Sequence, residues 1–149
     1  MRAKLIVLAL LGLLVSSGVG GASHPTFFPL SEHTIAKEIS ENGVPLYRTY
    51  TFTTDDEQAA SWLLVWRDAG VHKVEWRWYW PEGRTYARSF STIPAIDGFT
   101  GMWAAPVWSC LKIRDTDVAR MPGTWRVDVI VDYRKVLTEY FTINSPQAC

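Results

Sequence analysis

Residues 123–143 read GTWRVDVIVDYRKVLTEYFTI, and hydrophobic side chains recur in them at every second position. The alternation runs through 125–131, resumes in 136–143 and ends on Phe141 and Ile143. A period of two is typical of a strand that buries one face. With a tight turn around Tyr133 and Arg134, the stretch predicts an antiparallel β-hairpin.

A second hairpin is predicted upstream, where residues 74–91 read VEWRWYWPEGRTYARSFS. The segment Pro81-Glu82-Gly83 is typical of a three-residue hairpin loop, because proline pre-sets the first turn dihedral and glycine accepts the left-handed position. Such a loop fixes which residues face each other across the two strands. The expected pairs are Trp80 with Arg84, Trp78 with Tyr86, Trp76 with Arg88 and Val74 with Phe90.

Three further segments have strand-like composition, and a long loop separates two of the strands. Tyr47–Thr54 is rich in β-branched and aromatic residues, and Ala59–Trp66 is apolar on both faces, as expected of a central strand. Thr92–Pro106 reads as a loop and is followed by a strand over Val107–Ile113. About seven short strands in a chain of 149 residues predict an all-β fold, an antiparallel two-sheet sandwich.

The N-terminus has the composition of a cleavable secretory signal peptide over residues 1–22. A basic start, an apolar stretch from Leu5 to Val15 and small residues ending at Ala22 form the expected three regions. We therefore expect an irregular leader at 23–33 and a single β-sandwich domain at 34–149, exported to the periplasm or the extracellular space. The alternative is an uncleaved N-terminal anchor.

Charge and cysteine content limit the partners of the mature chain. The whole chain has 15 basic and 15 acidic side chains, and removal of Arg2 and Lys4 leaves 13 and 15, a formal charge of −2. This balance argues against nucleic-acid binding and stable membrane association. In an oxidising compartment, Cys110 and Cys149 are expected to form a structural disulfide, the alternative being a free Cys149 open to an intermolecular bridge.

The polar residues form no recognisable catalytic or metal-binding pattern, so we expect no enzyme activity, metal or cofactor. The three histidines, His24, His33 and His72, are not near a nucleophile motif and lack ligand spacing. Glu75 and Glu82 are the acids that raise the question of a glycosidase pair, but they fit ordinary surface positions. A hydrolase whose carboxylates converge only in the fold stays as an alternative.

Tryptophan is the unusual feature of the composition, with eight in the chain. We expect Trp62, Trp66, Trp125 and Trp108 to fill the core. The β-hairpin differs, because two arginines are predicted on the same face as its tryptophans, and unpaired guanidinium groups are rarely buried. The predicted ligand-binding residues are Trp76, Trp78, Trp80, Arg84, Tyr86 and Arg88, with Trp103 from the long loop. The alternative is that this face is core.

Two of these motifs resemble a known class of proteins. G-T-W-R-V-D-V at 123–129 with F-T-I at 141–143, and W-R-W-Y-W-P-E-G at 76–83, are similar to hairpins of uncharacterised bacterial exported domains with an immunoglobulin-like β-sandwich. The resemblance implies an immunoglobulin-like fold and an accessory or binding role, with no catalytic residues.

The expected function is therefore an exported, non-catalytic binding or interaction module with an unknown protein or glycan partner. The main alternative is a structural cell-envelope accessory domain that has no small ligand.

Overall fold

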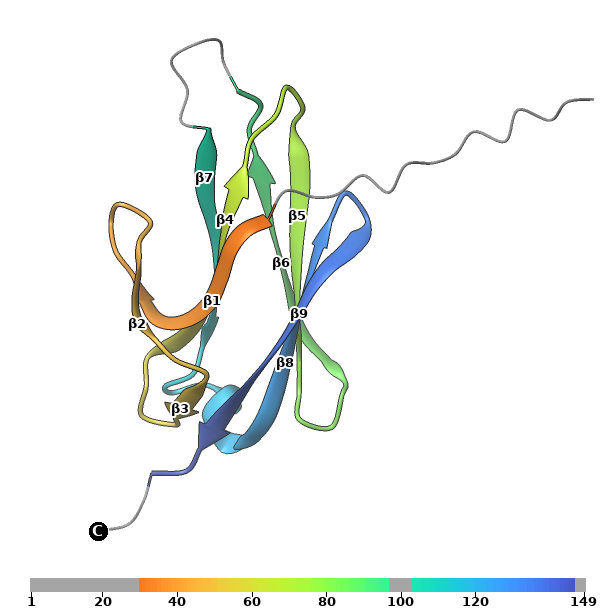
Figure 1. Cartoon of the computed structure of the whole chain (residues 1–149). Helices are drawn as coiled ribbons and strands as arrows, with labels where there is room; N and C mark the ends of the chain where they lie inside the picture. The colour runs from red at the N-terminus through yellow and green to blue at the C-terminus, as the bar shows by residue number, and fades with distance from the viewer. Residues whose placement is uncertain (1–29, 97–102, 147–149) are drawn as a thin grey trace, which may run out of the picture.

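The computed structural model describes residues 30–96 and 103–146, which form two layers of β-strands (Figure 1). The strands are, in chain order, β1 (Leu30–Ile39), β2 (Pro45–Arg48), β3 (Thr51–Thr53), β4 (Gln58–Trp66), β5 (His72–Tyr79), β6 (Thr85–Ile93), β7 (Ala104–Lys112), β8 (Gly123–Val131) and β9 (Arg134–Asn144). A short 3-10 helix, η2 (Asp117–Arg120), lies between β7 and β8.

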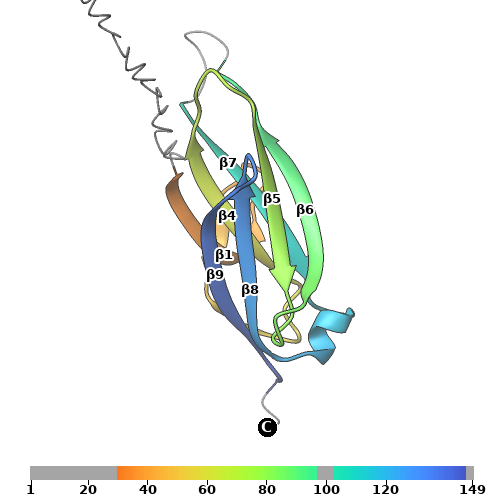
Figure 2. The same cartoon turned by 90° about the vertical axis from the view of Figure 1, so that its right-hand side faces the viewer.

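The strand order is that of an immunoglobulin-like sandwich. One sheet has the order β2-β1-β4-β7 and the other β3-β9-β8-β5-β6. In immunoglobulin terms, β1, β4 and β7 correspond to strands A, B and E, whereas β5, β6, β8 and β9 correspond to C, C′, F and G. Figure 2 shows the second sheet lying in front of the first. The predicted fold class is confirmed.

Two boundaries differ from those expected. The predicted strand Tyr47–Thr54 is split into β2 and β3, which belong to different sheets, and β3 pairs with β9 in parallel. β2 continues past Tyr47 to Arg48, and the chain crosses to the other sheet at Thr49 and Tyr50, so it does not continue as one strand. The predicted leader also ends early, because β1 begins at Leu30 and pairs with β4 from its first residue. The predicted signal peptide lies outside the described residues.

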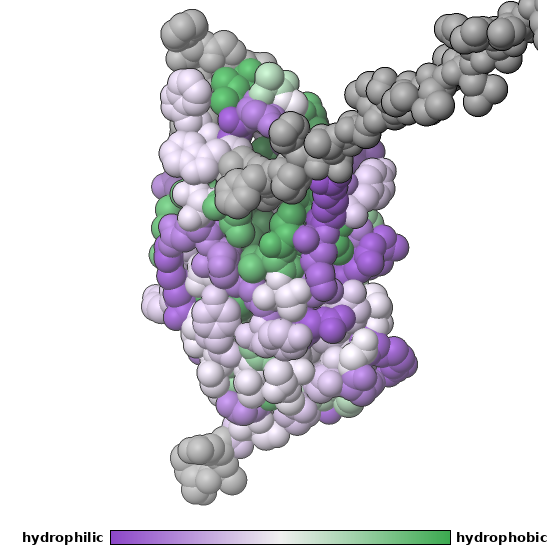
Figure 3. Space-filling model, turned by 45° about the vertical axis from the view of Figure 1, so that its right-hand side comes forward, coloured by the Kyte–Doolittle hydropathy of each residue, from purple (hydrophilic) through white to green (hydrophobic). Residues whose placement is uncertain are grey.

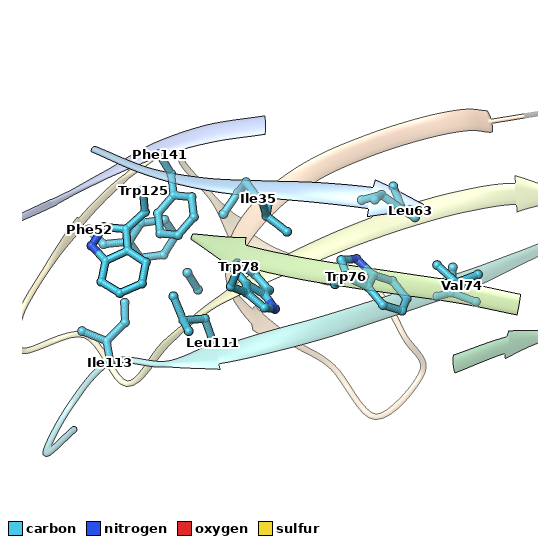
Figure 4. Close-up of a cluster of buried hydrophobic side chains, with 14 of the residues drawn as sticks. Ile35, Phe52, Leu63, Val74, Trp76, Trp78, Leu111, Ile113, Trp125 and Phe141 are labelled. Atoms are coloured by element: carbon cyan, nitrogen blue, oxygen red, sulfur yellow. The ribbon is translucent and has the colours of Figure 1, made fainter. Parts of the chain in front are cut away.

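The core consists of side chains from the facing sides of both sheets (Figure 4). The largest fully buried side chains include Trp76, Trp78, Trp125, Phe52, Phe141, Ile35 and Leu63. Phe141 is the centre of an aromatic group, with edge-to-face contacts to Phe52 at 5.7 Å and to Trp78 at 6.0 Å between ring centroids. Such pairs add roughly 0.5–1.5 kcal/mol beyond the burial of their area.

The β8–β9 hairpin forms as its sequence predicts. β8 and β9 pair from Gly123–Ile143 to Val131–Arg134, and the two residues between them, Asp132 and Tyr133, have positive φ angles of 46° and 68°. This combination is the type I′ turn that matches the twist of a two-residue hairpin. The turn lies one residue earlier than the predicted position.

The β5–β6 hairpin has the predicted loop but a different register. The Trp80 amide donates to the Arg84 carbonyl and Gly83 has a φ of 90°, as expected. A β-bulge follows, because Tyr79 pairs with Thr85 whereas Trp78 pairs with Ala87. One extra residue, Tyr86, is accommodated in β6, and the register from there on is shifted by one relative to the prediction.

Within 30–96 and 103–146, no helix has the length and hydrophobicity needed to cross a membrane. Figure 3 shows hydrophobic residues at the surface in the middle of one side, with hydrophilic residues around them. Leu30, Val136 and Leu137 are partly buried and pack against the core.

Candidate ligand-binding surface

The predicted Trp/Tyr/Arg platform on the β5–β6 hairpin is not formed. Trp76 and Trp78 are 0% and 1% exposed, and both belong to the hydrophobic core. The bulge at Tyr86 places Arg88 opposite Arg77, on the outer face of the sheet. There the Arg88 Nε donates to Glu75 Oε1 at 2.6 Å. The prediction was wrong because it assumed an unbroken register.

The turn end of the same hairpin is closed by aromatic packing. Trp80 and Tyr86 are half-buried, with ring centroids 4.6 Å apart, and both pack against Trp125 at 5.0 and 5.6 Å. Arg84 is exposed and forms an ion pair with Glu82 at 2.9 Å. Trp80 and Tyr86 therefore cap one end of the core and do not present free ring faces beside Arg84.

Exposed tryptophans lie instead on the outer face of the other sheet, across β4 and β7. The register pairs Trp62 with Trp108, Leu64 with Pro106 and Trp66 with Ala104, so these side chains alternate with the inward-facing ones. Trp66 is 50% exposed and Trp108 is 40% exposed. We call this set the tryptophan surface; it consists of Trp62, Leu64, Trp66, Pro106 and Trp108.

The β1–β2 connection borders the tryptophan surface and fixes Trp62 in it. The Trp62 indole N–H donates to the Gly43 carbonyl at 2.8 Å, and Trp62 is almost fully buried. Gly43 has a φ of +74°, and a Cβ there would lie 3.0 Å from the Pro106 ring and 3.1 Å from Trp108. Only glycine lets the backbone approach so closely, so this position holds the connection against the sheet.

One ion pair lies along the β1–β2 side of the tryptophan surface. Arg48 and Glu32 form a hydrogen-bonded ion pair, and the guanidinium carbon of Arg48 lies 5.7 Å from the centroid of the Trp62 ring. The two charges cancel, so the tryptophan surface has a polar border without net charge on this side. Such a surface favours contact with another apolar or ring-shaped surface over the binding of an ion.

Trp103, which was predicted to bind ligand, lies directly before β7 and is 66% exposed. The Arg67 amide donates to the Trp103 carbonyl at 2.7 Å, which continues the β4–β7 pairing by one step. Phe99 and Met102 of the predicted loop lie outside the described residues.

The sequence did not reveal which tryptophans are exposed, because β4 is apolar on both faces. The inward-facing residues of this strand are Ala59, Ser61, Leu63 and Val65, and the larger tryptophans face outward. The expectation that Trp66 and Trp108 fill the core was wrong, whereas Trp62 and Trp125 are buried as expected. Pro106 indicates that β7 is an edge strand, but an edge position does not say which face of the strand is exposed.

A buried polar cluster lies between the two sheets at Glu139 of β9. The Glu139 carboxylate is almost fully buried and accepts from His33 Nδ1 at 2.9 Å, Tyr50 Oη at 3.1 Å and Ser61 Oγ at 3.3 Å. Partial burial, together with the charge of Glu139, raises the pKa of Tyr50. Glu139 orients the half-exposed imidazole of His33, but the Ser61 hydroxyl is fully buried, which makes it inaccessible as a nucleophile.

Charged side chains cover the outer face of the second sheet. Hydrogen bonds from Arg77 and Arg88 lower the pKa of Glu75 to about 2. Beside them a shallow cavity of about 330 Å³ is lined by Glu75, Arg77, Asp128, Ile130, Tyr133 and Lys135. Glu82 is instead in the β5–β6 turn, paired with Arg84. The two glutamates considered as a glycosidase pair are thus each neutralised by arginine on separate parts of the hairpin.

Neither a disulfide nor a metal-binding cluster is seen in the described part of the chain. Cys110 is exposed on β7 and has no disulfide partner among the described residues; Cys149 lies outside them, so the pairing of the two cysteines stays a prediction. Among residues 30–96 and 103–146, no three His, Cys, Asp or Glu side chains are grouped in a way that could hold a metal ion.

Comparisons with known proteins identify similar folds but no family. No protein-family model and no curated protein matches the chain. The chain resembles a Pseudomonas fluorescens alkylpurine DNA glycosylase AlkC bound to DNA containing an abasic site analog, with 13% identity and a TM-score of 0.51. That match covers 79% of this chain and 30% of the glycosylase, so the chain spans less than a third of that protein.

A second similar structure is an immunoglobulin-like protein from Pseudomonas aeruginosa, with 11% identity and a TM-score of 0.44. The match covers 76% of this chain and 98% of that protein. At these identities the likeness to the glycosylase concerns the fold alone, and the candidate surface is defined by the residues of this chain.

Proposed function

We propose that this protein is an exported, non-catalytic binding module whose ligand, a glycan or a protein, contacts the tryptophan surface. The observation that carries the proposal is the half-exposure of Trp66 and Trp108 on one continuous apolar face of β4 and β7. Large aromatic side chains are costly to leave in water, and contiguous apolar patches on soluble domains mark interaction sites. Tryptophan is also enriched among the residues that dominate binding energy.

The rigidity of this surface supports a binding role. β4 and β7 pair without a break from Gln58–Lys112 to Trp66–Ala104, and Trp62 on the same face is fixed by its hydrogen bond to Gly43. A ligand would therefore meet rings that are already positioned, which lowers the entropy that binding must overcome.

The test is retention of the mature protein on insoluble glycans (cellulose, chitin and peptidoglycan sacculi) and the quenching of its tryptophan fluorescence by the soluble fragments. Trp66→Ala combined with Trp108→Ala should abolish retention. The matched control is Phe90→Ala, which removes an exposed aromatic ring from the opposite sheet and should leave retention unchanged.

Two outcomes would contradict the proposal in its glycan form. One is retention that survives the double substitution, which would place the ligand elsewhere on the protein. The other is the absence of retention on every glycan, which would leave a protein partner or the structural envelope role as the explanation of the exposed rings.

A further inference from the structure

At the end of the sandwich where β5 begins, one histidine joins two aspartates from different parts of the chain. His72 Nδ1 lies 2.6 Å from Asp132 Oδ2, in the β8–β9 turn, and His72 Nε2 lies 2.9 Å from Asp68 Oδ1, in the β4–β5 connection. Figure 1 shows this turn and this connection at the same end of the molecule. The imidazole thus joins the β8–β9 turn to the β4–β5 connection.

The geometry assigns a protonation state to His72. A neutral imidazole has one N–H group and can donate to one carboxylate only, whereas an imidazolium donates from both nitrogens. Both ring nitrogens face carboxylate oxygens here, so the arrangement is that of the charged form. In agreement, the hydrogen bonds to Asp132 and Asp68 raise the pKa of His72, against the opposing effect of partial burial.

The other charged groups on these elements have roles of their own. The Lys73 amide donates to Asp132 Oδ1 at 2.9 Å, and the Arg67 guanidinium donates to the carbonyls of Pro94 and Ala95. Arg134 begins β9 directly after the turn. The paired β6 residue, Ile93, is apolar, and within the described part of the chain Asp68 and Asp132 are the carboxylates hydrogen-bonded to His72.

Residues 67 and 68 hold the two segments on either side of residues 97–102. The Ile96 amide donates to the Asp68 carbonyl at 2.8 Å, and the Arg67 amide donates to the Trp103 carbonyl at 2.7 Å. Both hydrogen bonds are made by the main chain of residues 67 and 68, so a shift of this main chain would move Ile96 and the exposed Trp103, which directly precedes β7.

We propose that His72 is a pH-sensitive latch, which in its imidazolium form fixes Asp68 and through it the segments at Ile96 and Trp103, and which releases them when it loses its proton. The consequence for ligand binding, a tryptophan surface ordered at its Trp103 end under mildly acidic conditions, rests on the function proposed above. The latch itself does not depend on that function.

Asp68, and not Asp132, is the partner that deprotonation releases. Asp132 is at the shorter distance from the ring, also accepts from the Lys73 amide and is fixed in a two-residue turn. Asp68 is the more exposed of the two carboxylates, and its other hydrogen bond, from the Gly70 amide at 2.7 Å, lies within the β4–β5 connection itself and does not join it to another strand. The neutral ring therefore keeps its Nδ1–H bond to Asp132, and its Nε2 lone pair repels Asp68.

The direction of the pH effect follows from linkage. Because the pKa of His72 is higher in the folded protein than the ordinary value of about 6.5, the stabilisation is fully present below that ordinary value. It is lost as the pH rises through the folded-state pKa.

The experiment is an NMR titration of the mature protein without ligand, which follows the ring signals of His72 and the exchange protection of the Ile96 amide. We expect the His72 midpoint to lie above the ordinary histidine value of about 6.5. Over the same pH range the protection factor of Ile96 should fall severalfold.

Asp68→Asn is the matched variant, because it keeps the size of the side chain and removes its charge. In this variant the His72 midpoint should fall and the pH step at Ile96 should disappear. A His72 midpoint at or below the ordinary value of about 6.5, or Ile96 protection that is independent of the His72 titration, would overturn the latch. Since no ligand is used, failure of glycan binding leaves this result intact, and the reverse also holds.

Discussion

At the scale of single residues, buried and half-buried charges are held by donors from distant parts of the chain. Glu139 is the clearest example, because its three donors come from β1, from the residue before β3 and from β4. A carboxylate inside a sandwich is tolerated only with such partners. The cluster therefore links β9 to the opposite sheet. The sequence pattern did not predict it.

Glu139→Ala should lower the free energy of unfolding by about 2 kcal/mol, because it leaves the Ser61 hydroxyl buried without its acceptor and removes the inter-sheet contact. Urea denaturation at pH 7 measures this loss. Glu139→Gln, which keeps one acceptor oxygen, should be clearly more stable than the alanine variant. Equal stability of the wild type and Glu139→Ala would contradict a stabilising role for the cluster.

The lowered pKa of Glu75 predicts a loss of stability at acidic pH. Since hydrogen bonds from Arg77 and Arg88 lower its pKa to about 2, the stabilisation from this group is present above its ordinary pKa of 4.5 and is lost as the pH falls toward 2. The measurement is the carboxyl-carbon chemical shift of Glu75 during an acid titration. A midpoint near 4.5 would show that the two arginines do not hold the carboxylate in solution.

At the scale of elements, the β5–β6 hairpin shows how one bulge changes which face of the sheet a side chain lies on. The loop at Pro81–Gly83 forms as predicted, yet the extra residue at Tyr86 turns Arg88 to the outer face and leaves Trp76 and Trp78 in the core. Strand existence and turn type follow from local sequence, whereas a bulge depends on packing around it. Here that packing is the contact of Tyr86 with Trp80 and Trp125.

This packing predicts that the side chains at the two ends of the hairpin loop, Trp80 and Arg84, contribute unequally to stability. Trp80→Ala should cost roughly 3 kcal/mol of stability, because it removes a large side chain from the aromatic group at the end of the core. Arg84→Ala should change stability by less than about 0.5 kcal/mol, because its ion pair with Glu82 is exposed. Thermal unfolding of both variants checks this, and comparable losses in the two would contradict it.

At the scale of the whole molecule, the two-sheet fold follows from period-two patterning in 74–80 and 125–131, where one parity is apolar and the other polar. The same rule fails for β4, because both parities are apolar and the sequence does not say which faces the core. The site depends on that choice: Trp66 and Trp108 are exposed because the smaller Ala59, Ser61, Leu63 and Val65 fill the interior. Of the predicted binding residues, only Trp103 is extensively exposed and aromatic.

The two groups of tryptophans should therefore respond differently to truncation. Trp76→Ala should lower the free energy of unfolding by about 3–5 kcal/mol, the usual cost of emptying a large core position. The combined change Trp66→Ala and Trp108→Ala should cost less, since both rings are half in water already. Denaturant unfolding curves of the two variants measure the difference, and the reverse order would be incompatible with the arrangement of the sheets.

The most direct test of the central claim, that exposed tryptophans lie on β4 and β7 and the hairpin tryptophans lie in the core, is an NMR measurement of the indole N–H signals with a soluble paramagnetic agent. The signals of Trp66, Trp103 and Trp108 should broaden strongly, whereas those of Trp76, Trp78 and Trp125 should persist. If Trp76 or Trp78 broadens as readily as Trp66, the β5–β6 hairpin presents its rings to solvent and the tryptophan surface is wrongly placed.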